Sequence, residues 1–386
     1  MDGLEKMDRQ TIPLGRILGI PIKLDYSWIL IFALMTWTLA VGYYPAEFKN
    51  WPQIQYWIMA AATAVMLFVS VLLHELGHSV VAIHYKIPVK NITLFIFGGV
   101  SLIGAEPPTA MAGFWLSIAG PLVSLALAAL FSQLQHLFTG ISPLFALAKY
   151  LVYINFALAL FNLVPGFPLD GGGVLRAVVW GVTRSMRRAT LIASKVGLFI
   201  AYLFIFLGVW QIFRGNFLNG LWIAFIGWFL QSAAAGLLQQ QAIQDLLAGH
   251  KVSQAMSPHY TDIPADTTLQ QLVDNHILAG GQRSFLVREG NRVIGLLTLH
   301  HIKEIPRSEW PITTAAKAAL PAAEMKTVGP DEDLWAAMEE MDRDGVNQLP
   351  VMSGNKVMGI LRREDLISYL RTLHEISPPR ANERQQ

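Results

Sequence analysis

The sequence predicts a polytopic α-helical membrane protein with six transmembrane helices and a small membrane-associated β-hairpin, followed by a soluble α+β module made of two repeats. Three observations predict this class. The 386 residues are 53% hydrophobic and 15% charged, with a mean hydropathy of +0.41, well above that of a soluble protein. Apolar stretches long enough to cross a bilayer recur up to about residue 238. Two similar segments of lower hydropathy follow them.

The composition also excludes several classes of protein and site. The formal net charge is +2, and without a dense basic stripe we expect no nucleic acid partner. The chain has no cysteine, so any metal must be held by His, Asp, Glu or backbone oxygen. Residues 1–23 lack the apolar core and cleavage site of a secretory leader. We therefore expect a prokaryotic plasma membrane as the location.

Six spans are expected from the hydropathy, and the fourth is interrupted; they lie at about residues 26–45, 57–84, 111–138, 146–182, 190–213 and 217–238. Basic residues in the connecting loops predict their orientation. With the N-terminus inside, the inner loops carry Lys86, Lys90, Arg184, Arg187 and Arg188, and the outer loops carry Lys49, Lys149 and Arg214. We therefore expect an integral membrane protein with both termini in the cytoplasm.

The second span contains the sequence HELGH at residues 74–78. An ionised side chain at the bilayer centre costs about 2.5 kcal/mol or more, so these polar groups need a function. His74 and His78 are four residues apart and share one helical face, with Glu75 beside them. In this arrangement two neutral imidazoles bind zinc, and the adjacent carboxylate takes a proton from a zinc-bound water. The alternative is a chance match, with both histidines hydrogen-bonded to neighbouring helices.

Residues 88–104 are rich in β-branched and aromatic residues around Gly98 and Gly99, which predicts a strand pair. Non-helical backbone at membrane depth is tolerated only where protein buries it or a wet cavity satisfies it. We therefore expect this hairpin to pack against the bundle beside the metal. A surface hairpin in the headgroup zone is the alternative.

The fourth span is broken by two prolines and four glycines between residues 162 and 173, and freed backbone inside a membrane marks a functional cavity. Asp170 lies in this break and is the only acidic residue within the spans besides Glu75. It is the expected third zinc ligand, and both groups fall in the cytoplasmic half of their spans. A helix-capping role for Asp170 is the alternative. Asn162 either donates a hydrogen bond to the substrate or holds the unwound turn.

These motifs resemble those of the site-2 protease family of intramembrane zinc metalloproteases. The matching sequences are HELGH at 74–78, FGG at 97–99, AGPL at 119–122 and NLVPGFPLDGG at 162–172. The resemblance implies that His74, His78 and Asp170 bind Zn²⁺, that Glu75 is the general base, and that Asn162 assists at the substrate carbonyl. It also implies regulated intramembrane proteolysis of a single-span membrane protein.

Cleavage of a helical substrate requires local unwinding, because a helix hides its peptide bonds in internal hydrogen bonds. We expect the unwound substrate to add as an extended strand to the edge near residues 95–100, which would present its carbonyl group to zinc.

The C-terminal part contains a repeat, because residues 281–297 align without a gap to residues 345–361. Each copy predicts a helix, two strands joined by a Gly-Asn turn, and a further helix. The pair resembles a tandem of cystathionine-β-synthase (CBS) repeats, which pack together and in many proteins bind adenine nucleotides. We expect a protease domain over residues 1–245 and a CBS domain over 246–376, with repeats at about 250–306 and 319–374. A disordered tail is expected over 377–386.

Ligand-binding CBS repeats often end their last strand with a hydroxyl residue for phosphate, followed three positions later by an Asp for ribose. The first repeat has Thr298 but His301, and the second has Arg362 but Asp365. Each repeat keeps half of the pattern. Binding of AMP or ATP through Thr298 and Asp365 therefore stays open beside a role in docking or in forming a homodimer.

Two other classes of function compete with proteolysis. A catalytically silent membrane scaffold is disfavoured because the set His74, Glu75, His78 and Asp170 is intact. A transporter gated by the CBS repeats is disfavoured because the spans contain neither a repeated half nor a row of charges along an ion path.

Overall fold

The computed structural model describes residues 11–96, 98–354 and 356–376. The chain divides into two compact units between Gln241 and Ala242. The expected domain boundary between residues 245 and 246 stays a prediction. The expected disordered tail, residues 377–386, lies outside the described residues.

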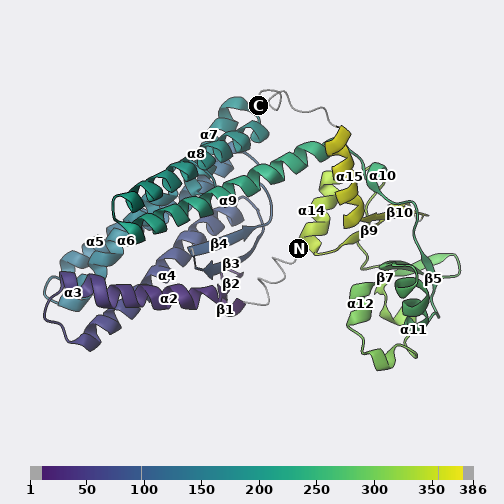
Figure 1. Cartoon of the computed structure of the whole chain (residues 1–386), viewed down its shortest axis with the longest axis horizontal. Helices are drawn as coiled ribbons and strands as arrows, with labels where there is room; N and C mark the ends of the chain where they lie inside the picture. Colours follow the sequence, from purple (N-terminus) through teal and green to yellow (C-terminus); the bar gives the residue numbers. More distant parts are fainter. Residues whose placement is uncertain (1–10, 97, 355, 377–386) are drawn as a thin grey trace. The chain divides into compact units, whose positions relative to one another are not determined.

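Among the described residues, six helical segments are long and apolar enough to cross a membrane (Figure 1), which confirms the predicted number of spans. The first combines α2 (Ser27–Thr38), the π-helix η1 (Leu39–Tyr43) and α3 (Tyr44–Glu47). The others are α4 (Gln53–His84), α5 (Ala110–Leu137), α6 (Ser142–Asn162), α8 (Met186–Phe213) and α9 (Phe217–Leu247). The interrupted fourth span resolves into α6 and the shorter α7 (Asp170–Thr183). The helix that carries the last span continues to Leu247, past the predicted end of the apolar stretch at about residue 238.

The predicted hairpin is part of a larger sheet. Its strands are β3 (Val89–Phe95) and β4 (Gly98–Ile103), with Phe97 outside the described residues. A second hairpin, β1 (Thr11–Ile17) and β2 (Ile20–Asp25), extends it to four strands in the order β1-β2-β3-β4, with β2 and β3 parallel. The prediction of a two-stranded element was therefore wrong in extent. Its signal was the period-two alternation in residues 20–25, where Ile20, Ile22 and Leu24 are buried.

One face of this sheet packs on α4. Ile22 and Ile92 form a cluster with Leu76, and Leu24 and Leu94 form one with Val71. Figure 1 shows the sheet lying beside α4. The expectation that the hairpin packs beside the HELGH sequence is confirmed. Its depth in the membrane stays a prediction. Strand β4 lies at an edge of the sheet, so its outer side has no strand partner among the described residues.

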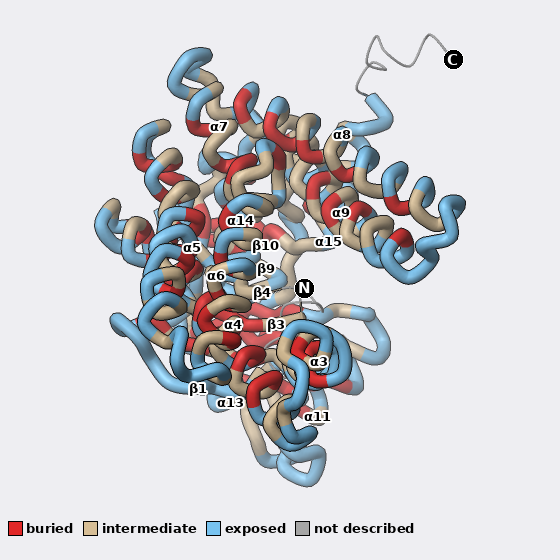
Figure 2. Tube along the Cα trace, turned by 90° about the vertical axis from the view of Figure 1, so that its left-hand side faces the viewer, coloured by how far each residue is buried: buried red, intermediate tan, exposed pale blue. Residues whose placement is uncertain are grey.

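Small residues bring the helices of the membrane unit into close contact. Gly77 is an example, because a Cβ atom there would lie 2.8 Å from Cγ2 of Val123 on α5. Figure 2 shows buried segments on the inward faces of these helices and exposed segments on their outward faces. The outward faces carry large apolar side chains such as Leu30, Trp37 and Phe199. Close interior packing with an apolar exterior is what a lipid environment favours.

The second unit contains the two predicted repeats. One sheet contains β5 (Asp262–Pro264), β6 (Ser284–Glu289) and β7 (Arg292–Thr298) from the first repeat, and β8 (Leu320–Pro321) from the start of the second. The other sheet contains β9 (Gln348–Ser353) and β10 (Lys356–Arg362). The helices are α10 (Val252–Ala255), α11 (Leu269–Leu272), η2 (Val273–Leu278), α12 (Leu299–Lys303), η3 (Arg307–Glu309), α13 (Ala315–Ala318), α14 (Leu334–Asp344) and α15 (Arg363–Ile376).

Both predicted hairpins of the repeats are present, and they share one hydrophobic cluster. Leu286 and Leu296 from the first repeat meet Val357 and Ile360 from the second. The repeats therefore pack as a pair. Asn355, in the predicted turn of the second hairpin, lies outside the described residues.

Candidate metal centre

Helix α4 places His74 and His78 one turn apart on its buried face. Their exposed fractions are 4% and 8%. The Nε2 atoms of the two rings lie 3.3 Å apart, so the i, i+4 spacing predicted from sequence brings both imidazoles to one point.

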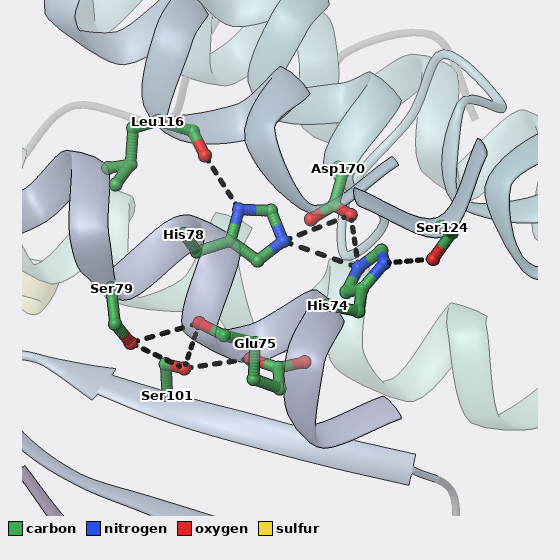
Figure 3. Close-up of polar contacts among 8 residues, drawn as sticks. All are labelled: His74, Glu75, His78, Ser79, Ser101, Leu116, Ser124 and Asp170. Carbon is green, nitrogen blue, oxygen red and sulfur yellow. Dashed lines mark hydrogen bonds and ion pairs between the residues drawn. The ribbon is translucent and has the colours of Figure 1, made fainter. Parts of the chain in front are cut away.

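Asp170 reaches the same point from another helix. Its Oδ2 atom lies 3.1 Å from Nε2 of His74 and 3.3 Å from Nε2 of His78. Among the described residues these three side chains form a group whose ligand atoms all lie within 4.8 Å of one another. Figure 3 shows the three converging from α4 and the start of α7.

The break between α6 and α7 carries Asp170 to this position. The N-cap of α7 is Leu169, and Asp170 is the first helical residue. The capping role considered as the alternative is therefore not the one observed, because Oδ2 faces the histidines. The loop before it is held against α8 by a hydrogen bond from the N–H of Phe167 to the Ala193 carbonyl, 3.3 Å long.

Helix α5 fixes the orientation of both rings. The Nδ1–H of His78 donates to the carbonyl of Leu116 at 2.6 Å, a contact that requires the proton on Nδ1 because a carbonyl only accepts. Nδ1 of His74 lies 2.9 Å from Oγ of Ser124, and we assign it as the donor. Both Nε2 lone pairs then face Asp170. Such bonds to the second ring nitrogen are typical of metal-binding histidines.

The surroundings fit a zinc ion. Zinc with ligands at about 2.0–2.1 Å in a tetrahedron separates neighbouring ligand atoms by about 3.3 Å, close to the distances between these three atoms. Gly120 on α5 keeps this volume open, because a Cβ atom there would overlap Nε2 of His78 and lie 2.5 Å from Nε2 of His74. The glycine of the AGPL sequence, Gly120, therefore matters because it has no side chain and leaves room for the two rings.

Glu75 directly follows His74 on α4, and its carboxylate contacts strand β4 of the sheet. Oγ of Ser101 on β4 donates to Oε2 of Glu75 at 2.8 Å. Oγ of Ser79 donates to the backbone carbonyl of Glu75 at 2.9 Å. Figure 3 shows the carboxylate between α4 and the strand.

Asn162 is the last residue of α6 and is half-buried. Among the described residues, no hydrogen bond joins its side chain to the histidine–aspartate group. One face of α6 is tied to α4 by a different asparagine. The Nδ2 of Asn155 donates to Oγ of Ser70, 3.2 Å away and one turn before His74.

Sequence reasoning missed Ser101, Ser124 and the Leu116 carbonyl. A serine in a strand or in an apolar helix is too common to single out, and a backbone carbonyl has no residue-specific signal. A buried hydroxyl at membrane depth was the available hint.

In the CBS unit, Thr298 and Asp365 each make a contact where a strand passes into the following helix: Thr298 ends β7, and Asp365 lies in the first turn of α15. Oγ1 of Thr298 lies 3.3 Å from Nδ1 of His301, and Oδ2 of Asp365 accepts the N–H of Arg362 at 3.0 Å. Partial burial lowers the pKa of His301, which keeps its ring neutral and able to accept. Thr298 and Asp365, the two residues predicted to bind nucleotide, therefore each make a hydrogen-bonding contact with a residue three positions away.

Two family models match this chain. Peptidase family M50 matches residues 62–143 and 134–204, which include His74, His78 and Asp170. The CBS domain matches residues 318–372, the second repeat.

Full-length relatives agree with these matches. Rip3 of Mycobacterium tuberculosis, whose name describes it as a candidate zinc metalloprotease, is 35% identical over 364 residues, 93% of this chain and 92% of its own. The zinc metalloprotease MJ0392 of Methanocaldococcus jannaschii is 25% identical over 360 residues, 92% of this chain and 95% of its own. A solved structure, the site-2 protease from Methanocaldococcus jannaschii, is 29% identical, covering 58% of this chain and 94% of that one with a TM-score of 0.42.

The buried histidine pair, the aspartate at the helix break and the similarity along almost the whole length of Rip3 agree with one another. This chain belongs to peptidase family M50 and is a zinc metalloprotease of the site-2 protease type with C-terminal CBS repeats.

Proposed function

We propose that this protein is an intramembrane endopeptidase that hydrolyses peptide bonds of single-span membrane proteins. One observation carries the proposal: ligand atoms of His74, His78 and Asp170 converge among apolar, span-length helices, and Glu75 places a carboxylate next to His74. A hydrolytic site embedded among membrane spans suits a substrate that is itself embedded.

We assign the roles from geometry. His74 and His78 offer Nε2 and Asp170 offers Oδ2 to the ion. Bound zinc supplies a Lewis acid that polarises a peptide carbonyl and makes water more acidic. Glu75 takes a proton from the attacking water at Oε1, since Oε2 is engaged by Ser101, and delivers it to the leaving amine. Asn162 is assigned to donate a hydrogen bond to the substrate carbonyl, which supports that group as it gains negative charge.

The substrate strand is proposed to add to the outer edge of β4. Gly104 donates its N–H toward β3, to the carbonyl of Pro88 at 2.7 Å. Because N–H groups alternate in direction along a strand, those of Ile103 and Ser101 point to the free edge. An unwound substrate segment pairing there would be held extended next to Glu75.

Replacing Glu75 by Gln tests the proposal. The amide keeps the size of the side chain but cannot accept the proton, so we expect zinc to stay bound and cleavage to fall by at least about a hundredfold. The measurement uses purified full-length protein in phospholipid vesicles, with single-span peptides that each carry two adjacent glycines at a different depth.

Glu106→Gln is the matched control, because Glu106 is an exposed carboxylate in the loop before α5, and it should cleave like the wild type. Undiminished cleavage by Glu75→Gln would contradict the proposal, as a scaffold or a transporter predicts no loss. Failure of the wild type to cut any of the peptides would also contradict it.

The expectations for the CBS unit stay predictions: adenine nucleotide binding through Thr298 and Asp365, and a homodimer formed through this unit. Calorimetric titration of the full-length protein with ATP and with AMP tests the first. We expect binding that Asp365→Ala weakens; equal heats from both proteins would leave docking or dimerisation as the role of the repeats.

A further inference from the structure

Strand β4 touches the proposed general base directly. Oγ of Ser101 donates to Oε2 of Glu75 at 2.8 Å, and it lies 3.5 Å from the backbone carbonyl of the same residue. The backbone of Gly99, two positions earlier on β4, packs closely against the Glu75 side chain. A Cβ atom at Gly99 would lie 2.6 Å from Cγ of Glu75. Figure 3 shows the Glu75 carboxylate held between α4 and this strand.

We propose that Ser101 is a positioning residue for the reaction, which fixes Oε2 of Glu75 so that Oε1 is aimed at the attacking water. The inference rests on the proposed function, since it assumes that Glu75 is the base. A glutamate side chain has several rotatable bonds, and holding it in one rotamer before the reaction removes an entropic part of the barrier. A hydroxyl bonded to a carboxylate is suited to this, because charge-assisted hydrogen bonds are stronger than neutral ones.

The location of Ser101 adds a second consequence. It lies on the edge strand proposed to pair with the substrate, so one piece of backbone would set the positions of both the base and the scissile bond. Among the described residues, Ser101 is the side chain that hydrogen-bonds the Glu75 carboxylate. Oγ of Ser79 donates to the backbone carbonyl of Glu75, which is an ordinary i−4 bond of a helical serine. It also lies 3.5 Å from Oγ of Ser101 but does not bond the Glu75 carboxylate.

Three variants of the zinc-loaded full-length protein separate positioning from a structural role. Ser101→Ala removes the hydroxyl, and we expect kcat to fall about tenfold, the effect of one hydrogen bond to a charged group. KM for the glycine-pair peptide that the wild type cuts fastest should stay within about twofold, and zinc content should not change. Ser101→Thr keeps a hydroxyl and should restore most of kcat. Ser79→Ala, the control, removes a hydroxyl 3.5 Å from Oγ of Ser101 but leaves the bond from Ser101 to Glu75, and it should leave kcat near the wild-type value.

A double-mutant cycle supplies the sharper test. Glu75→Asp retracts the carboxylate by one methylene group, out of reach of Ser101. In that background the Ser101→Ala change should lower kcat by less than about twofold, because the bond is already lost. A hydroxyl that merely stabilised the sheet would cost the same in both backgrounds.

The outcomes distinguish this inference from the proposed function. If Glu75→Gln abolishes cleavage while Ser101→Ala has the wild-type kcat, the positioning role is overturned and the proposed function stands. The positioning role is also overturned if Ser101→Thr fails to restore kcat, or if the effects of Ser101→Ala and Glu75→Asp on kcat are additive. A Ser101→Ala variant that loses zinc or has a raised KM, with kcat unchanged, would overturn it as well. If Glu75→Gln cleaves normally, the proposed function itself is wrong.

Discussion

The candidate metal centre depends both on residues that supply ligand atoms and on a residue that leaves room for them. His74, His78 and Asp170 offer the candidate ligand atoms, but their convergence requires that nothing else occupy the same volume. Gly120 on α5 meets that requirement, because it faces both Nε2 atoms without a side chain. A residue with no chemistry of its own is thus expected to be essential to metal binding.

Gly120→Ala tests this expectation. The added methyl group would overlap Nε2 of His78 and crowd Nε2 of His74, so at least one ring must turn away. We expect at least about tenfold weaker zinc binding, as when the support of a ligand is lost, with cleavage reduced in proportion. Metal analysis of the purified protein measures it.

Gly113→Ala on the same helix is the control for the Gly120 change. A Cβ atom there makes ordinary contacts, 3.4 Å to Cγ of Pro107 and 3.7 Å to Cβ of Ala177. It should bind zinc normally and stabilise the helix slightly, by roughly 0.5–1 kcal/mol. Full zinc content in Gly120→Ala would refute the spatial role of Gly120.

At the scale of secondary structure, the sheet and the helix break bring the site together. Strands β2 and β3 cover α4 with apolar side chains, and this leaves β4 at the edge beside Glu75. The break between α6 and α7 turns Asp170 toward the same helix. The site therefore lies between one continuous helix, one interrupted helix and a strand edge that has no partner strand in the part of the chain that the structure describes.

The free edge of β4 predicts a specific effect of proline. Ile103→Pro removes an N–H that points outward, so β3 keeps its hydrogen bonds while an added substrate strand loses one. We expect kcat/KM to fall by up to about tenfold, the net value of one hydrogen bond, with unchanged zinc content. Peptide cleavage in vesicles measures the change.

Ile103→Ala is the companion variant, because it removes the side chain but keeps the N–H. If both variants lose the same activity, the side chain matters and strand pairing does not. If neither loses activity, the substrate does not pair with this edge.

At the scale of the whole molecule, the distribution of charge over the loops predicts the orientation in the membrane. The inner loops are expected to carry Lys86, Lys90, Arg187 and Arg188, and the outer loops fewer basic residues such as Lys49 and Arg214. The metal group would then lie toward the cytoplasm, because His74 and His78 are in the last third of α4.

Single cysteines can test this orientation without background, because the chain has none. In intact cells, a membrane-impermeant maleimide should label Lys49→Cys and Arg214→Cys but not Lys90→Cys or Arg188→Cys. After the membrane is permeabilised, all four should react. The reverse pattern in intact cells would place both termini outside and contradict the assignment.

Much of this protein was accessible from its sequence because the relevant information is local. Hydropathy over a span, the i, i+4 spacing of His74 and His78, and the prolines and glycines around Asp170 act within one or two helical turns. The repeats were visible as self-similarity and fold as predicted. Local patterns failed for residues 11–25, where mixed composition masked an alternating strand whose partner, β3, lies far along the chain.

Only the tertiary structure decided which distant groups surround the ligands. Ser101 contacts Glu75 across 26 residues of chain, Ser124 contacts His74 across 50, and Asp170 contacts His74 across 96. Hydrogen bonds and steric contacts act over a few ångströms, so a residue's effect depends on neighbours that packing selects. The sequence by itself determined the number of spans, the candidate zinc ligands and the repeats; packing determined the sheet beside α4, the open volume at Gly120 and the support of Glu75.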